Sequence, residues 1–129
     1  MTTLTPVDPS DAPEALGGYT QAMLVEGASR LLFVSGQIPQ TREGKVPEDF
    51  EAQCRLVWAN ILAALRAAGL AASDLVKVTT YLSDRRYADV NGTVRREVLG
   101  DHRPALTVII ADIFDSDWLL EIEAVAAAR

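Results

Sequence analysis

The segment from Pro47 to Gly69 constrains the fold most, because its apolar residues recur with the period of an α-helix. Its first turn holds proline and two acidic residues, which suit a helix N-terminus, and Gly69 suits the C-terminal end. The apolar positions follow spacings of 4, 3, 4, 4 and 3: Phe50, Cys54, Val57, Ile61, Leu65 and Ala68. The pattern predicts a helix with one buried face, which a second layer of structure must cover.

A second helix is predicted from Asp84, a favourable N-cap, to about Leu99, with Gly100 as its stop. The apolar side chains predicted for its buried face are Tyr87, Val90, Val94 and Val98.

Short apolar or β-branched segments precede, separate and follow these helices. The segments predicted as strands are 19–27, 30–36, 74–82, 105–114 and 118–128, and residues 40–46 are predicted to form a minor hairpin. The first two strands are expected to flank a turn at 26–29. The first 16 residues hold three of the six prolines and are predicted as an extended arm of a single domain spanning 1–129.

The last predicted strand alternates in character. Trp118, Leu120, Ile122 and Ala124 fall on one side, and Glu121, Glu123 and Val125 fall on the other. The order of elements predicts an α+β fold, in which a mixed β-sheet carries both helices on one face. The opposite face then presents carboxylates among apolar residues, a surface that predicts burial by oligomerisation.

The charge and cysteine content narrow the possible functions. A net charge of −6 disfavours nucleic acid as a partner, and no segment holds the roughly 20 apolar residues of a membrane span. The single cysteine permits no disulfide within the chain, and the N-terminus has no secretory pattern, so we expect a cytoplasmic protein. One histidine and no phosphate-binding motif predict neither a metal nor a nucleotide cofactor.

Four features are candidates for chemistry. Glu121 and Glu123 share a strand face roughly 7 Å apart, which suits either a pair of acid–base carboxylates or an ordinary polar face. Ser35 and Gly36 end an apolar strand, where they form either a ligand contact or a simple turn. His102 is interpreted as a loop histidine near a helix end, and Cys54 as a buried structural thiol.

Several motifs occur in an order that carries a family resemblance. They are GGYTQA (17–22), LLFVSGQIP (31–39), NILAALRAAG (60–69), DLVKVTTYLSD (74–84), VNGTVRREVLG (90–100), RPALT (103–107) and LEIEAVA (120–126). From Tyr19 onward the chain resembles the RidA (YjgF-type) family. The resemblance implies a chorismate-mutase-like fold and a homotrimer, whose sheets form an inner barrel with three ligand clefts between subunits. Deaminating members hydrolyse enamines or imines such as 2-aminoacrylate to 2-oxo acids and ammonia, without a cofactor.

The resemblance also implies which residues line the cleft. The matching positions are Tyr19, Ser35, Gly36, Asn91 and Glu121, and Leu106 and Thr107 border the same cleft. Glu121 is expected to orient or activate a water molecule.

One departure from the family pattern bears on the substrate. Leu106 stands where deaminating members have the arginine that binds the substrate carboxylate, and Val108 stands at the position of a frequent cysteine. Arg103 is a candidate replacement, although its place before Pro104 directs it away. The first hypothesis is therefore deamination of an enamine or imine other than a simple 2-imino acid. The alternatives are a non-catalytic small-molecule-binding or regulatory trimer and, less favoured by the acidic charge, a ribonuclease or translation inhibitor.

Overall fold

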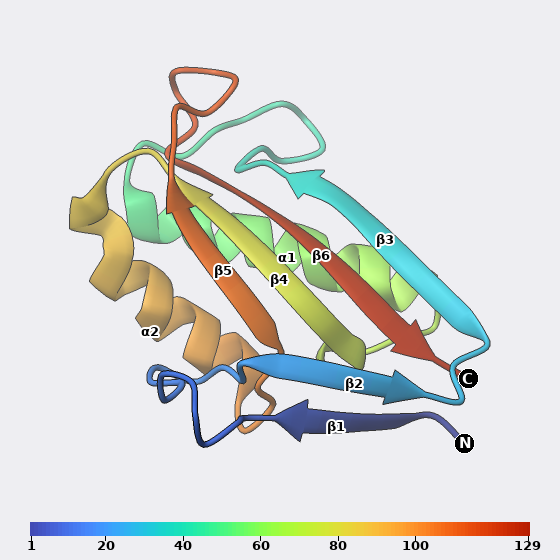
Figure 1. Ribbon diagram of the computed structural model, residues 1–129. Coiled ribbons are helices and arrows are strands. Elements are labelled where there is room, and N and C mark those ends of the chain that lie inside the picture. The colour runs from blue at the N-terminus through green and yellow to red at the C-terminus, as the bar shows by residue number, and fades with distance from the viewer.

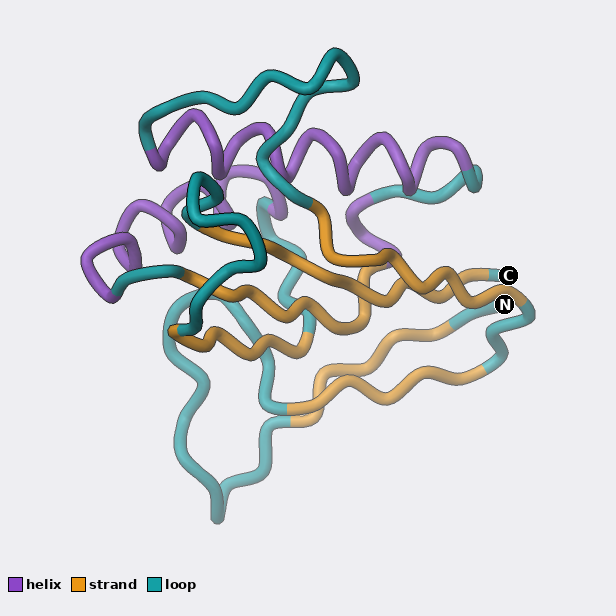
Figure 2. The backbone as a smooth tube through the Cα atoms, turned by 90° about the horizontal axis from the view of Figure 1, so that it is seen from above, coloured by secondary structure: helices purple, strands orange, loops and turns teal.

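The computed structural model describes residues 1–129 as two helices packed on one side of a four-stranded sheet, with a separate two-stranded ribbon (Figures 1 and 2). The helices are α1 (Phe50–Ala67) and α2 (Ala88–Leu99), and the short 3₁₀ turns are η1 (Ala72–Asp74) and η2 (Arg85–Tyr87). The strands are β1 (Thr3–Val7), β2 (Ala22–Glu26), β3 (Arg30–Gln37), β4 (Leu75–Leu82), β5 (Ala105–Ile110) and β6 (Leu120–Ala128). Neither helix is long and apolar enough to cross a membrane.

The four-stranded sheet is mixed, in the order β3-β6-β4-β5. The central strand β6 is antiparallel to both β3 and β4, and β4 is parallel to the edge strand β5. The predicted mixed sheet with both helices on one face is therefore confirmed. The trimeric barrel stays a prediction.

Helix α1 buries the apolar face that the sequence predicts. Asp49 is its N-cap, and its carboxylate accepts a hydrogen bond of 3.1 Å from the backbone N–H of Ala52. The predicted residues from Phe50 to Leu65 are all buried, and Trp58 joins them in the core against the sheet. The helical spacing predicted these buried residues correctly because α1 is a regular helix that packs one face against the sheet.

Helix α2 begins later than predicted. On its predicted buried face, Val94 is buried and both Tyr87 and Val98 pack against the core, whereas Val90 does not. Asp84 caps the 3₁₀ turn η2, and the α-helix begins only at Ala88. Val90, predicted to be buried, is 37% exposed. The 3₁₀ turn winds more tightly than an α-helix, so it shifts which side chains reach the core. The residues that α2 buries are Asn91, Gly92, Val94, Arg95 and Leu99.

Two predictions about the N-terminal half need correction. Residues 40–46 form no hairpin strands; they make a turn in which the N–H of Thr41 bonds the carbonyl of Lys45 at 2.9 Å. The predicted arm contains β1, which pairs with β2. The two strands predicted around the 26–29 turn are present, and they belong to different sheets because β3 pairs with β6. A single bridge between Thr20 and Ala105 joins the ribbon to the edge strand β5.

The two faces of the four-stranded sheet have different surroundings. The covered face packs against the helices and includes Leu32, Val34, Val78, Thr80, Leu82, Leu106, Ile122 and Ala124. The opposite face, which we call the bare face, includes Leu31, Phe33, Ser35, Lys77, Thr79, Tyr81, Thr107, Ile109, Glu121, Glu123 and Val125. Figure 2 shows both helices on one side of these strands. The alternation predicted for β6 is thus confirmed.

Candidate functional site

A β-bulge in β3 brings together three of the predicted site residues. The register shifts between Val34, which pairs with Ala124, and Gln37, which pairs with Ile122. Three steps along β3 therefore match two along β6, and the extra residue lies in the segment that holds Ser35 and Gly36. Bulges re-aim side chains, and this one sets Gly36 beside Glu121.

Glu121 lies over Gly36 so closely that no other residue fits there. A Cβ atom added at Gly36 would overlap Oε2 of Glu121 and lie 2.7 Å from its Cδ. The absent side chain leaves room for the carboxylate to lie flat against the β3 backbone. This contact gives Gly36 a defined role, which goes beyond the simple strand-exit turn that the sequence also allowed.

The neighbouring carboxylates Glu121 and Glu123 have different surroundings. The hydroxyl of Tyr81 donates a hydrogen bond of 2.8 Å to Oε1 of Glu123, and this bond raises the pKa of Tyr81 because it stabilises the protonated phenol. Glu121 accepts no hydrogen bond within the protomer. Both carboxylates line a shallow depression of about 260 Å³, together with Tyr81, Asp112, Ile113 and Phe114. Glu121 is therefore the carboxylate left free to bind a ligand or a water molecule.

Thr107 also lies on the bare face, two strands away from β6. Its hydroxyl accepts a hydrogen bond of 2.6 Å from Nζ of Lys77, across the parallel pair β4–β5. A lysine, a threonine and two glutamates thus line one surface that no helix covers.

The remaining predicted site residues lie elsewhere in the protomer. Leu106 is in register with the buried Val78, so its side chain faces the helix side, where it packs against the core. Asn91 is 2% exposed, and its Oδ1 lies 3.9 Å from Sγ of Cys54. Tyr19 lies in the loop before β2. One protomer therefore holds the predicted residues in two main groups: Ser35, Gly36, Thr107 and Glu121 lie on the bare face, and Leu106 and Asn91 lie on the helix side. Tyr19 stands apart in its loop, and the roles of all these residues stay predictions.

The helix–helix contact holds a polar group that the sequence reasoning missed. Cys54 is fully buried, which raises its pKa to about 12, so it is the inert thiol that the sequence predicted. Arg95 lies one helical turn after Asn91 and is 6% exposed. Arginine side chains usually lie at the surface, so the residue type gives no sign of this burial. The i, i+4 spacing from Asn91 was the only available signal.

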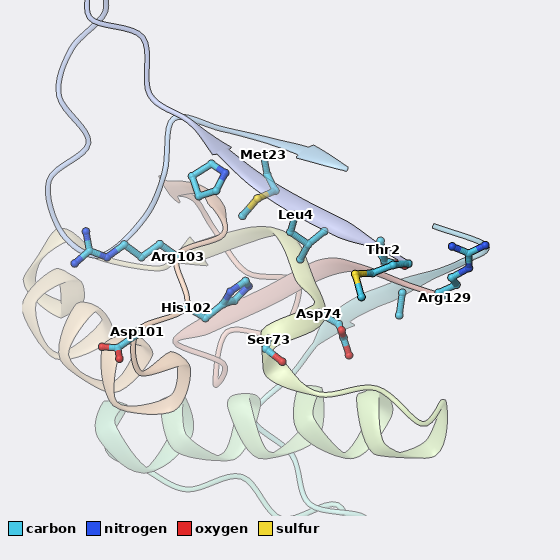
Figure 3. A pocket seen from close by; sticks show the side chains of 13 residues that line it. Thr2, Leu4, Met23, Ser73, Asp74, Asp101, His102, Arg103 and Arg129 are labelled. Atoms are coloured by element: carbon cyan, nitrogen blue, oxygen red, sulfur yellow. The ribbon is translucent and has the colours of Figure 1, made fainter. Parts of the chain in front are cut away.

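The largest cavity contains none of the predicted site residues. It has a volume of about 670 Å³ and lies between the β1–β2 ribbon and one end of the main sheet (Figure 3). His102 lines it and contacts the carbonyl of Leu75 through Nε2 at 2.7 Å, as a structural loop histidine. Arg103 points away from the other side chains in Figure 3. No group of three or more His, Cys, Asp or Glu side chains is placed to hold a metal ion.

Comparison with known proteins decides the family. The profile described as Endoribonuclease L-PSP matches residues 9–128. A 2-iminobutanoate/2-iminopropanoate deaminase of Escherichia coli is 35% identical over 124 residues, which cover 92% of this chain and 94% of that protein. The chain belongs to the Rid (YjgF-type) family.

Other Rid relatives support this assignment. A RutC family protein of Pyrococcus horikoshii is 39% identical over 119 residues, covering 90% of this chain and 91% of that protein. The crystal structure of a Rid family protein of unknown function from Yersinia pestis superposes with a TM-score of 0.85, covering 97% of this chain and 98% of that one. At 24% identity, that likeness concerns the fold. The resemblance read from the sequence motifs is confirmed at the level of the family.

Proposed function

We propose that this Rid protein hydrolyses an enamine or imine other than a simple 2-imino acid, in clefts between the subunits of a homotrimer. The observation that carries the proposal is the carboxylate of Glu121, held against Gly36 with no hydrogen-bond partner in its own protomer. A free carboxylate on an uncovered sheet face is suited to hold the attacking water and to accept its proton.

The reaction balances with water as the only co-reactant. An enamine tautomerises to its imine, and the water oxygen bonds to the carbon of the C=N group while Glu121 accepts one water proton and passes it to the nitrogen, which gives a carbinolamine. As the C–N bond breaks, the remaining hydroxyl proton moves to the nitrogen through Glu121, so ammonia leaves and the water oxygen remains as the carbonyl. No cofactor takes part in this scheme, and no electrons are transferred to or from an external group.

The substrate class follows from Leu106. A leucine side chain donates no hydrogen bond, so it cannot replace the charged contacts of an arginine, which are worth roughly 1.5–3 kcal/mol each. Leu106 also packs against the core in the protomer. We therefore expect weak turnover of 2-aminoacrylate compared with relatives named as 2-iminobutanoate/2-iminopropanoate deaminases.

The assembly is part of the proposal because the bare face needs a cover. Phe33 is 72% exposed and Leu31 is 61% exposed on this face. Apolar side chains at this density favour contact with other copies of the chain. Such contact would bring Glu121 of one subunit toward the Leu106 side of another, and so join the two groups of predicted residues. The free thiol of Cys54 agrees with a reducing, cytoplasmic location.

Glu121→Gln tests the chemistry, with Glu123→Gln as its matched control. The assay supplies 2-aminoacrylate, generated enzymatically, and in a second arm an imine made from a primary amine by an amine oxidase, which carries no adjacent carboxylate. We expect turnover of the second substrate to fall at least 100-fold in Glu121→Gln and only a few-fold in Glu123→Gln. Equal effects of the two substitutions would remove Glu121 from the mechanism.

Leu106→Arg tests the substrate assignment in the same assay. We expect the substitution to raise turnover of 2-aminoacrylate, because it restores a carboxylate-binding guanidinium. Wild-type turnover of 2-aminoacrylate equal to that of an arginine-bearing relative would contradict the assignment.

A second candidate function is non-catalytic binding of a small molecule. It is favoured by the burial of Asn91, which the protomer packs against Cys54 instead of presenting to a ligand. Ligand-induced thermal stabilisation without turnover of either substrate would support this alternative. Ribonuclease activity is the least favoured, because the net charge of −6 opposes binding of a phosphate backbone.

A further inference from the structure

Arg95 is a buried cation without an anionic partner. It is 6% exposed, and both ion pairs of the chain are made by Arg55 instead. Burial lowers the pKa of Arg95, and the positive charge of Arg96 beside it adds to the shift. A buried guanidinium is normally stabilised by a carboxylate or another anion, because its own desolvation is unfavourable. The protomer supplies no such group.

One edge of the Arg95 guanidinium is only half satisfied. Nη2 donates a hydrogen bond of 2.7 Å to the carbonyl of Gly17, while Nε is buried and has no acceptor. The N–H bonds of Nε and Nη2 project in parallel from this edge and match the two oxygens of a carboxylate. The Gly17 carbonyl offers one oxygen, so it fills half of a site with carboxylate geometry.

The group above this edge, the Gly17 carbonyl, belongs to an exposed loop. Gly17 is exposed, and a Cβ atom added to it would meet nothing within 4 Å. Its φ of +106° is one that glycine adopts without strain. The hydrogen bond to Nη2 of Arg95 is the one that the Gly17 carbonyl accepts in the protomer, so turning this carbonyl away would break one hydrogen bond.

Arg95 lies among residues of the predicted ligand cleft. Asn91 precedes it by one helical turn, and Tyr19 follows Gly17 by two residues. The adjacent Thr20 donates its N–H to the carbonyl of Pro104 at 3.2 Å, next to the start of the strand that carries Leu106.

Arg103 differs from Arg95 in its surroundings. It is exposed, and it forms neither a hydrogen bond nor an ion pair in the protomer, so it is not a buried charge in need of an anion. Its role as a replacement for the arginine missing at Leu106 stays a prediction.

We propose that Arg95 binds a carboxylate of the ligand, and that the Gly17 carbonyl occupies the place of that carboxylate in the free protomer. The inference rests on the proposed function for its cleft and extends it to the ligand class. The ligand is an enamine or imine whose carboxylate is not attached to the reacting carbon, because the cation has moved from the strand that carries Leu106 to helix α2. The Gly17 carbonyl turns to solvent when the ligand binds.

The test measures binding of a simple probe by titration calorimetry on the intact assembly at constant ionic strength. Butanoate is the probe, and the controls are its neutral amide, butanamide, and inorganic phosphate. We expect wild-type protein to bind butanoate at least tenfold more tightly than either control. Equal binding of butanoate and butanamide would overturn the proposal, and so would tighter binding of phosphate, which would indicate a general oxyanion site.

Arg95→Met and Arg96→Gln form the matched pair of variants. We expect Arg95→Met to weaken butanoate binding at least tenfold and Arg96→Gln to change it less than threefold. Unchanged affinity in Arg95→Met would overturn the proposal. A fall in the mass of the Arg95→Met assembly would also overturn it, because the carboxylate would then belong to a neighbouring subunit.

Thermal unfolding without ligand distinguishes ligand binding from a structural role. Replacing an unpaired buried charge with an apolar side chain of similar length should leave the Tm unchanged or raise it. A clear loss of Tm, or failure to fold, would show that Arg95 serves the fold and would overturn the proposal. Butanoate contains no C=N group, so its binding is independent of turnover. Binding that depends on Arg95 without any deaminase activity would support this inference while contradicting the proposed reaction.

Discussion

The two faces of the four-stranded sheet carry different kinds of residue. The covered face is almost entirely apolar, and its central positions on β4 and β6 are sealed beneath the helices. The bare face presents Lys77, Glu121 and Glu123 beside exposed side chains such as Phe33. Both faces come from the same alternating strands, so the difference reflects what each face must contact. Packing against the helices determines the covered face, whereas the proposed assembly and chemistry concern the bare face.

The largest expected effect comes from the covered face. Ile61 is fully buried on α1, and Ile61→Ala should lower the free energy of unfolding by about 2–5 kcal/mol, because it removes buried methyl groups and leaves a cavity. Denaturant unfolding monitored by circular dichroism measures this loss. The exposed Val90 on α2 supplies the control, since Val90→Ala should change stability by less than about 0.5 kcal/mol. Similar losses in the two variants would break the distinction between covered and uncovered positions.

A charge introduced on the bare face should change the oligomeric state of the protein. Phe33→Glu places a charge at a position that is exposed in the protomer but lies in the proposed interface. We expect the assembly to dissociate while the helical circular dichroism signal of the protomer remains. Light scattering coupled to gel filtration measures the mass. An unchanged mass in Phe33→Glu would place the interface elsewhere.

A substitution that disturbs the contact between Gly36 and Glu121 should reduce enzymatic turnover more than it reduces stability. Gly36→Ala adds a Cβ atom where the carboxylate lies, so it should displace Glu121 and cost about 1–3 kcal/mol through overpacking. Turnover in the deaminase assay should fall as far as in Glu121→Gln. Ser35→Ala, on the exposed neighbour, should leave stability within about 0.5 kcal/mol. Full activity in Gly36→Ala would show that the position of the Glu121 carboxylate does not matter.

A last effect concerns the covered side at alkaline pH. Burial raises the pKa of Cys54 from 9.0 to about 12, so the folded state holds its proton more tightly than the unfolded state. The resulting contribution to stability is complete below pH 9.0 and is lost as the pH rises to about 12. At pH 8 a thiol reagent should label Cys54 only after denaturation. Rapid labelling of native protein at that pH would contradict the burial.

Local periodicity made some elements predictable from sequence and left others beyond reach. The buried face of α1 follows from the helical period and the two-sided character of β6 follows from the two-residue period of a strand, and both predictions are confirmed. The start of α2 was predicted too early because a 3₁₀ turn precedes the helix, and β1 was missed because a proline-rich segment pairs with a strand 15 to 23 residues later. The family motifs pointed to Gly36 and Glu121, whereas their contact depends on a bulge that spacing does not reveal.

Arg95 illustrates a different limit. Charged residues are expected at the surface, and the hydrogen-bond partner that Arg95 finds is 78 residues away along the chain. The loop that holds Gly17 meets α2 only in the folded chain, where Arg95 is 6% exposed. Its half-satisfied edge could therefore be found only in the folded structure.

Sedimentation velocity of the wild-type protein tests the central claim, that other copies of the chain cover the bare face. Across a dilution series, the proposed trimer predicts a species of three times the 14.0 kDa chain mass. A species of 14.0 kDa at all concentrations would contradict the claim, because Leu31 and Phe33 would then remain in contact with water and the two groups of site residues would never meet.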